Sequence, residues 1–353
     1  MSASHFKRPI ILTLGTRGDV QPFLLLAREL LRRGAAPLLM ASGHFAPLAR
    51  EAQVPMASIL EGDAVWKMDS KEASPQKAAD IFHASLARHM SAMLRQIERV
   101  ASEHRADVVV VGSVIWTIAW LRRTLQLPLV HVFLQPARWL DSLRGPTRVT
   151  VTDAFRRSAI HPEIDPDYVA ARAEHCGELH LLAYPDDLGV THLPQHQGVC
   201  TGFWVAPQPP TSKVPPSLAA FLQIQPAPVC LNFGSMDVYS ATWMPPLLQT
   251  LRQLLQDGCR LLVIGDLAPQ AVRDWPRTLW VPSAPHAAVF PHCVAIIHHG
   301  GAGTSAAAIT AARPSVVVPH LTWIVRRCLS SLSNLIAMPR ASHLARKDEL
   351  LPI

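Results

Sequence analysis

The sequence predicts an α/β protein with two domains, each built on a doubly wound parallel sheet. Short apolar runs alternate with helix-like segments along most of the chain, as expected for strands that helices cover on both faces. A proline-rich stretch interrupts this alternation beyond the middle of the 353 residues. That length itself favours two domains, each large enough for a core of its own.

The first half of the chain begins with a predicted strand over residues 9–14, PIILTL. A turn with two glycines follows, and a helix is then predicted over residues 22–34, with Pro22 in its first turn and Gly34 at its end. Further strands are predicted over residues 36–42, 107–112 and 127–134. Because these runs are apolar almost throughout, they are expected in the interior of a covered sheet.

Seven prolines lie within residues 206–228, where no helix or central strand is expected for that reason. This stretch is predicted to link an N-terminal domain, 1–205, to a C-terminal domain, 229–322, with residues 323–353 as an atypical tail. Strands are predicted in the second half over residues 228–234, 260–265, 278–283, 294–299 and 314–320. Two such domains form a cleft in which ligands bind at the carboxyl ends of the strands.

Composition excludes several classes of protein. The formal charge of +7 comes mainly from arginine, in scattered pairs instead of basic runs, which disfavours nucleic-acid binding. The six cysteines form no CxxC pair, as is typical of a reduced cytoplasmic protein. The N-terminus does not resemble a signal peptide, and the most apolar segment, 108–121, is too short to span a bilayer. A cytoplasmic protein is therefore expected, with contact at a membrane surface left open.

The most informative segment is HHGGAGTSAAA at 298–308, which predicts a strand tip, a glycine turn and the start of a helix. Glycines allow close approach of the main chain to a ligand, and a helix N-terminus presents free N–H groups to an anion. His298 and His299 either add donors to that site or are core histidines bonded to the main chain. The glycine pair favours the first interpretation, so a phosphate or diphosphate cradle is predicted.

Two more glycine turns, GTRGD at 15–19 and FGSM at 233–236, also follow apolar strands directly. Ser235 fits a helix N-cap or a phosphate contact, and these roles are compatible. Asp19 fits a helix cap or a general base that takes a proton from an acceptor hydroxyl. The two roles of Asp19 conflict in part, because N–H bonds to a carboxylate lower its pKa.

The segment GAGTSA also matches the dinucleotide pattern G-x-G-x-x-A. That pattern needs an acidic residue at the end of the next strand to bind ribose, yet no Asp or Glu occurs from Trp275 through Lys347. The hydride-transfer alternative is therefore disfavoured. The same lack of carboxylates suits a diphosphate leaving group.

The chain resembles the UDP-glycosyltransferase superfamily in four segments, 15–34, 201–204, 228–236 and 285–308. The branch that it resembles most acts on sterols, lipids, polyketides and glycopeptides. The resemblance implies the GT-B fold, with two facing Rossmann-like domains, the C-terminal one shortened. It implies transfer of a hexose from a UDP- or dTDP-sugar to a hydroxyl of a small lipophilic acceptor, inverting and without metal or other cofactor. The partners implied are therefore the acceptor and the nucleotide sugar, without nucleic acid.

Carried over by position, the resemblance implies that Asp19 is the catalytic base. It implies a nucleotide-sugar site formed by Thr16, Arg17, Gly18, Gly234, Ser235, His299, Gly301, Ala302, Gly303 and Thr304. An apolar acceptor pocket would be lined by residues 60–95 and 131–150. These segments include Trp66, Phe82, Phe133 and Trp139, although each of these aromatic residues also fits a core position.

Two departures from the family matter. Ala307 stands where plant members carry a ribose-binding Glu, which leaves UDP and dTDP open as donors. The Asp-Gln pair that holds sugar hydroxyls in the family is missing, and Trp323, Ile324 and Val325 stand in that region. The tail is therefore expected to be truncated or divergent, and the alternative function is a non-catalytic nucleotide-binding remnant.

Overall fold

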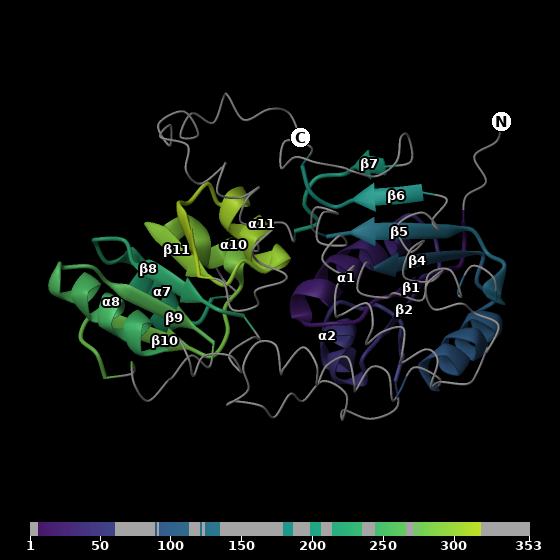
Figure 1. The fold of residues 1–353 in the computed structure, drawn as a ribbon, viewed down its shortest axis with the longest axis horizontal. Helices are drawn as coiled ribbons and strands as arrows, with labels where there is room; N and C mark the ends of the chain where they lie inside the picture. The colour runs from purple at the N-terminus through teal and green to yellow at the C-terminus, as the bar shows by residue number, and fades with distance from the viewer. Residues whose placement is uncertain are drawn as a thin grey trace. The chain divides into compact units, whose positions relative to one another are not determined.

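The computed structural model describes residues 6–60, 89, 92–112, 121, 124–134, 179–185, 198–205, 214–234, 244–265, 272 and 274–318. They form two compact units that divide between Trp204 and Val205. Each unit holds one parallel sheet with helices against it (Figure 1). The α/β class predicted from the sequence is confirmed.

The first unit contains a seven-stranded sheet in the order β3-β2-β1-β4-β5-β6-β7, parallel throughout. Its strands are β1 (Pro9–Leu12), β2 (Leu38–Ala41), β3 (Met56–Ser58), β4 (Val108–Gly112), β5 (Leu129–Phe133), β6 (Leu179–Leu182) and β7 (Gly198–Cys200), and its labelled helices are α1 (Arg17–Arg32), η1 (Gly43–Phe45) and α2 (Ala46–Glu51). The predictions of β1, β2, β4 and β5 are confirmed. Strands β3, β6 and β7 fall outside the predicted ranges.

Apolar side chains cover both faces of this sheet, since successive strand residues point to opposite faces. On one face, Ile11 belongs to a buried cluster with Phe23 of α1. On the other face, Ile10 belongs to a cluster with Ile97 of a helix over residues 92–104. Helix α1 is therefore fixed by its buried side, and its N-terminus is held at the end of β1.

Helix α1 begins at Arg17, before the predicted start at Pro22. Thr16 is the N-cap, so the predicted turn is in fact the first turn of the helix. Pro22 therefore lies inside the helix, where it offers no N–H to the carbonyl of Gly18. The prediction was wrong because proline is typical of a first turn, whereas a capping box between Thr16 and Asp19 starts this helix earlier.

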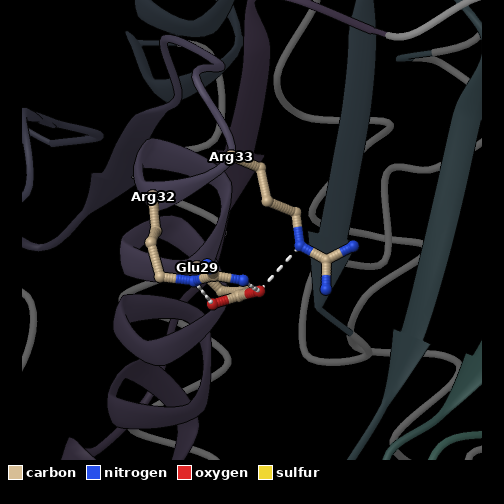
Figure 2. Close-up of polar contacts among 3 residues, drawn as sticks. All are labelled: Glu29, Arg32 and Arg33. Atoms are coloured by element: carbon tan, nitrogen blue, oxygen red, sulfur yellow. Dashed lines mark hydrogen bonds and ion pairs between the residues drawn. The ribbon is translucent and has the colours of Figure 1, made fainter.

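At the exposed C-terminal end of α1, a glutamate forms ion pairs with two of the arginines that give the chain its positive charge. Glu29 forms ion pairs with Arg32 and Arg33, each at 2.7 Å (Figure 2). Hydrogen bonds from Arg32 and then Arg33 lower the pKa of Glu29 to about 2. Because all three side chains are exposed, the cluster contributes little to folding, and it is a solvated surface feature.

The second unit contains a five-stranded parallel sheet in the order β10-β9-β8-β11-β12. Its elements are α7 (Pro216–Gln223), β8 (Val229–Asn232), α8 (Met244–Gln256), β9 (Leu261–Ile264), β10 (Thr278–Val281), α10 (His286–Val289), η7 (Phe290–His292), β11 (Ala295–His298), α11 (Ala302–Thr310) and β12 (Ser315–Val317). All five strands lie within predicted ranges and are confirmed. No helix among the described residues is long and apolar enough to cross a membrane.

Helix α7 lies within 206–228, so the expectation that this stretch holds no helix is wrong. Pro215 is the N-cap and Pro216 the first helical residue, positions at which a missing N–H breaks no helical hydrogen bond. Leu218 and Leu222 are buried in the apolar core of the second unit. The described part of the predicted linker therefore belongs to that core.

The guanidinium group of Arg260, directly before β9, holds the end of α7. It donates to the carbonyl oxygens of Phe221 at 2.7 Å, Pro226 at 3.2 Å and Ile224. It also lies 3.9 Å from the centroid of the Phe221 ring. The last carbonyls of a helix lack partners within it, and this one buried side chain donates to the chain at and just after the end of α7.

Each sheet reverses its strand order beside its first strand. β1 lies between β2 and β4, and β8 lies between β9 and β11. In open parallel sheets, ligands bind outside the carboxyl ends of the strands at such a reversal. The turns after β1, β8 and β11 are therefore the expected ligand-binding loops of their units.

Replacing Arg260 by Met should lower the free energy of unfolding by about 1.5–3 kcal/mol, the usual contribution of hydrogen bonds that involve a charged group. Urea unfolding followed by circular dichroism measures this loss. Arg252→Met is the matched control, because Arg252 also lies over an aromatic ring, 5.3 Å from the centroid of Trp275, but is exposed. Equal losses in the two variants would contradict the role given to Arg260.

Candidate functional site

The turn after β1 is built around the carboxyl group of Asp19, the third residue of α1. Its Oδ2 accepts the main-chain N–H of Thr16 at 2.7 Å and the hydroxyl of the same residue at 3.1 Å. The main-chain carbonyl of Asp19 accepts the hydroxyl of Thr13 at 2.9 Å. Asp19 thus helps to cap a helix, as one of the two interpretations of the sequence expects, but it does so from within the first turn. Thr16 is the N-cap, and Asp19 completes the capping box instead of preceding a helix that begins at Pro22.

Gly15 is required by this arrangement. Its φ is +123°, and a Cβ at this position would lie 2.3 Å from Oδ2 of Asp19. At Gly18, by contrast, the nearest neighbour of a Cβ would be Oγ1 of Thr16 at an ordinary 3.6 Å. Contacts within the described chain therefore explain Gly15 but not Gly18, whose small size leaves the main chain accessible.

Burial raises the pKa of Asp19 to about 6, and the two hydrogen bonds from Thr16 lower it without cancelling the effect of burial. The sequence predicts that hydrogen bonds to a capping carboxylate lower its pKa, and at Asp19 desolvation outweighs that effect. A carboxyl group with a pKa near 6 is mostly ionised at neutral pH and still accepts a proton readily. The hydrogen bonds and the pKa of Asp19 are therefore compatible with both interpretations that the sequence leaves open.

Thr16, Arg17 and Gly18 lie beside Asp19 in the first unit. Arg17 is exposed, and its Nε donates to Oε1 of Gln21 at 3.2 Å. The other described residues predicted to bind the nucleotide sugar lie together in the second unit, and Ser235 lies outside the described residues.

In the second unit, the ends of β8 and β11 are neighbours. Asn232, the last residue of β8, pairs with His298, the last residue of β11. The turns that begin at these two positions therefore leave the sheet side by side, which brings Gly234 close to His299. Two glycine turns separated in the sequence form one site.

The ring of His299 occupies the space between two glycines. A Cβ at Gly234 would lie 3.0 Å from Cε1 of His299, and a Cβ at Gly301 would lie 2.2 Å from Nε2. Gly234 and Gly300 also have positive φ, +65° and +87°. The sequence attributes these glycines to a ligand, and the chain's own imidazole is a second reason for glycine at position 301.

The two adjacent histidines have different roles. His298 is 1 % exposed, and its Nδ1 accepts the main-chain N–H of Gly300 at 3.1 Å. Burial, with smaller contributions from His299 and His286, lowers the pKa of His298 to about 3. His298 is thus the core histidine bonded to the main chain that the sequence leaves as an alternative, and the expectation that it donates to an anion is wrong.

His299 is half-buried, and desolvation lowers its pKa to about 4 although a hydrogen bond to the main chain of Asn232 acts in the opposite direction. The imidazole is therefore neutral at neutral pH. A phosphate placed beside it would favour the protonated form, which has a second N–H to donate.

Helix α11 begins directly after this histidine, with Gly301 as its N-cap and no acidic residue in its first turn. Its first intrahelical bond runs from the N–H of Ser305 to the carbonyl of Gly301 at 2.9 Å. The amides of Ala302, Gly303 and Thr304 therefore have no partner within the helix, and they carry its positive end. The side chain of Thr304 is buried, so its contribution to this end is its main-chain amide.

Two further residues, Asn232 and His286, belong to the site and were not predicted. Oδ1 of Asn232 accepts the main-chain N–H of Gly234 at 2.8 Å, and its Nδ2 lies 2.7 Å from Nε2 of His286. A polar residue at the end of an otherwise apolar strand was the available signal for Asn232. His286 is distant in the sequence, and nothing in its local pattern distinguishes it.

The predicted acceptor-pocket aromatics are described only in part. Phe133 is fully buried and packs against the ring of His131, with centroids 4.0 Å apart, so it is a core residue. Trp66, Phe82 and Trp139 lie outside the described residues, as does the predicted tail.

Solved structures with this architecture are glycosyltransferases of the GT-B fold. The glycotransferase of kitacinnamycin matches with a TM-score of 0.68 over 96% of this chain and 89% of its own, at 16% identity. A spinosyn rhamnosyltransferase matches with a TM-score of 0.65 over 94% of this chain and 84% of its own, at 20% identity. It has also been solved with thymidine diphosphate and with spinosyn aglycone. The chain therefore has the predicted GT-B fold.

Curated relatives extend this likeness to the sequence. A sterol 3-beta-glucosyltransferase of Arabidopsis thaliana is 26% identical over 88% of this chain and 56% of its own length. An O-mycaminosyltylonolide 6-deoxyallosyltransferase of Streptomyces fradiae is 27% identical over 90% of this chain and 83% of its own. The chain spans about half the length of the plant sterol glucosyltransferases that it matches, and no family model matches it. The predicted resemblance to the UDP-glycosyltransferase superfamily is confirmed.

Gly301→Ala should lower the free energy of unfolding by about 1–3 kcal/mol, because the new methyl group displaces the ring of His299. In a His299→Ala background the overlap is gone, and only the N-cap preference for glycine over alanine remains, below about 1 kcal/mol. Urea unfolding of both single variants and the double variant measures this coupling. The same cost in both backgrounds would show that His299 does not explain the glycine.

Proposed function

We propose that this chain transfers a hexose from a UDP- or dTDP-sugar to a hydroxyl group of a small lipophilic acceptor, with inversion and without a metal ion. The observation that carries the proposal is the carboxyl group of Asp19, whose pKa is about 6 at the strand-order reversal of the first unit. The relatives, which are sterol and natural-product glycosyltransferases, support the same class of reaction.

Asp19 would act on the acceptor. As the acceptor oxygen forms its bond to the anomeric carbon of the sugar, its proton passes to the carboxylate of Asp19. The N–H and O–H groups of Thr16 hold that carboxylate in place, so it enters the reaction already oriented. Oδ2 accepts both of these bonds, which leaves Oδ1 as the oxygen for the proton.

The second unit would act on the leaving group. When the bond between the anomeric carbon and the diphosphate breaks, negative charge grows on the diphosphate oxygens. The amides of Ala302, Gly303 and Thr304 and the ring of His299 are the donors that would stabilise this charge. These donors belong to the chain itself and can serve the purpose that a divalent cation serves elsewhere. A single displacement of this kind inverts the anomeric carbon.

A cytoplasmic site of action is part of the proposal. Among the described residues Cys230, Cys259 and Cys293 form no disulfide, in keeping with a reducing compartment. An acceptor as lipophilic as a sterol would be taken from a membrane surface, which makes peripheral contact part of the proposal too.

Isothermal titration with UDP and dTDP tests the nucleotide site. His299→Ala should weaken binding by about 1.5–3 kcal/mol, the usual range for a hydrogen bond to a charged group. His292→Ala is the control, since His292 lies in η7 of the same unit. If His299 gains a proton beside the diphosphate, the heat of binding will also depend on the ionisation enthalpy of the buffer.

Three outcomes would redirect the proposal. Unchanged affinity in a folded His299→Ala variant removes His299 from the site. Nucleotide binding without transfer to any lipophilic alcohol supports the non-catalytic remnant instead. Binding of NAD in preference to both diphosphates would revive the hydride-transfer alternative.

Asp19→Asn should lower turnover about 10²–10⁴-fold, because the amide keeps the bond from Thr16 but accepts no proton. The rate of the unsubstituted protein should rise with pH through about 6 as Asp19 ionises, and that step should be missing in the variant. Initial rates of transfer between pH 5 and 8 measure both effects.

The free energy of unfolding gives a second test of Asp19, because it should change with pH in the direction opposite to the rate. The pKa of Asp19 is raised on folding, so its contribution to stability is complete below about pH 4 and is lost as the pH rises through 6. The variant should therefore gain stability relative to the unsubstituted protein across that interval. Asp107→Asn is the control, since Asp107 also accepts main-chain N–H groups, from Lys7 and Arg8, at an exposed position. A normal rate with lower stability would make Asp19 a cap only.

A further inference from the structure

The side-chain amide of Asn232 bridges two parts of the second unit. Asn232 is 2 % exposed and ends β8. A main-chain N–H can only donate, so the atom facing Gly234 at 2.8 Å must be Oδ1. The NH₂ group of Asn232 then necessarily faces His286, at 2.7 Å from Nε2.

This geometry fixes the chemical state of His286. Because Nδ2 of Asn232 is a donor, Nε2 of His286 must be the acceptor, and the imidazole must be neutral with its proton on Nδ1. The ring is also held in orientation, since it stacks on Phe290 with centroids 4.5 Å apart and an angle of 11° between the planes. Phe290 is fully buried, so this ring is a fixed platform.

Asn232 in turn contacts the site through two groups. Its side chain holds the amide of Gly234, whose φ of +65° places that turn against His299. Its main chain forms a hydrogen bond with His299 itself. A shift of Asn232 would therefore move both the glycine turn and the imidazole.

We propose that His286 is a positioning residue for the diphosphate site: as a neutral acceptor it orients Asn232, and Asn232 sets the turn at Gly234 and the ring of His299. His286 touches no reacting atom in this scheme and acts through the amide. The proposal rests on the proposed function for its ligand, a nucleoside diphosphate, but the contacts that it names exist in the free protein.

Two substitutions of His286 distinguish the effect of its hydrogen-bond acceptor from the effect of its aromatic ring. His286→Phe keeps an aromatic ring against Phe290 but offers no acceptor, whereas His286→Gln loses the ring but supplies an amide oxygen to Nδ2 of Asn232. UDP and dTDP should bind at least tenfold more weakly to the Phe variant and within about threefold of normal to the Gln variant. A tenfold loss corresponds to about 1.4 kcal/mol. His292→Phe, the same change in η7, should leave the affinity unaltered.

Nuclear magnetic resonance of protein with ¹⁵N-labelled histidine gives a readout that needs no nucleotide. In the free protein His286 should show the neutral form with its proton on Nδ1. The ring resonances of His299 should shift in His286→Phe and not in His286→Gln. Circular dichroism of each variant confirms that it is folded.

The possible failures are distinguishable. If the His299 resonances stay unchanged in a folded His286→Phe variant, or if His286 carries its proton on Nε2, the positioning role is overturned. Equal loss of affinity in the Phe and Gln variants overturns it as well, because the acceptor would not matter. If the resonances shift as expected but the unsubstituted protein binds neither diphosphate, the proposed function fails while the positioning of His299 stands.

Discussion

The parallel pairing of β8 with β11 is the constraint on which the second unit's site depends. Its register sets Asn232 beside His298, on the sheet face that carries Cys230 and Ile296. Because strand residues alternate between faces, a slip by one residue would exchange the environments of the two adjacent histidines. The register therefore decides that His298 is a core residue and that His299 emerges between the two glycine turns.

Desolvation then determines the charge of each site group. In the second unit it keeps the imidazoles of His298 and His299 neutral, with pKa values of about 3 and 4. No carboxylate occurs between Trp275 and Lys347, and the first turn of α11 therefore holds none that would oppose the positive end of the helix. In the first unit the same effect raises the pKa of Asp19 and makes a capping carboxylate basic.

Much of this architecture was predictable because long apolar runs have few alternatives in an α/β chain. The strands with four or more consecutive apolar residues were found, and so were the turns after β1, β8 and β11. Helix boundaries were harder, because Pro22 and Pro216 are the same residue type at different helical positions. The capping box of Thr16 and Asp19 shows where α1 begins, and the burial of Leu218 shows that α7 belongs to a core.

The contacts of the candidate site were less predictable, since they join residues distant in the sequence. The glycine-turn motifs identified Asp19 and His299 as candidate residues. They could not distinguish the role of His298 from that of His299, because that difference depends on the register of β11. The bond between Asn232 and His286 spans 54 positions and has no periodic signal. Hydrogen-bond complementarity of this kind appears only after the strands are paired.

The glycines of the two units have a common physical reason that changes how their pattern is interpreted. Gly15 makes room for the carboxyl group of Asp19, and Gly301 makes room for the ring of His299. In each case the absent side chain accommodates the group proposed to do the chemistry. Gly18 differs, because no close contact of the described chain requires glycine there.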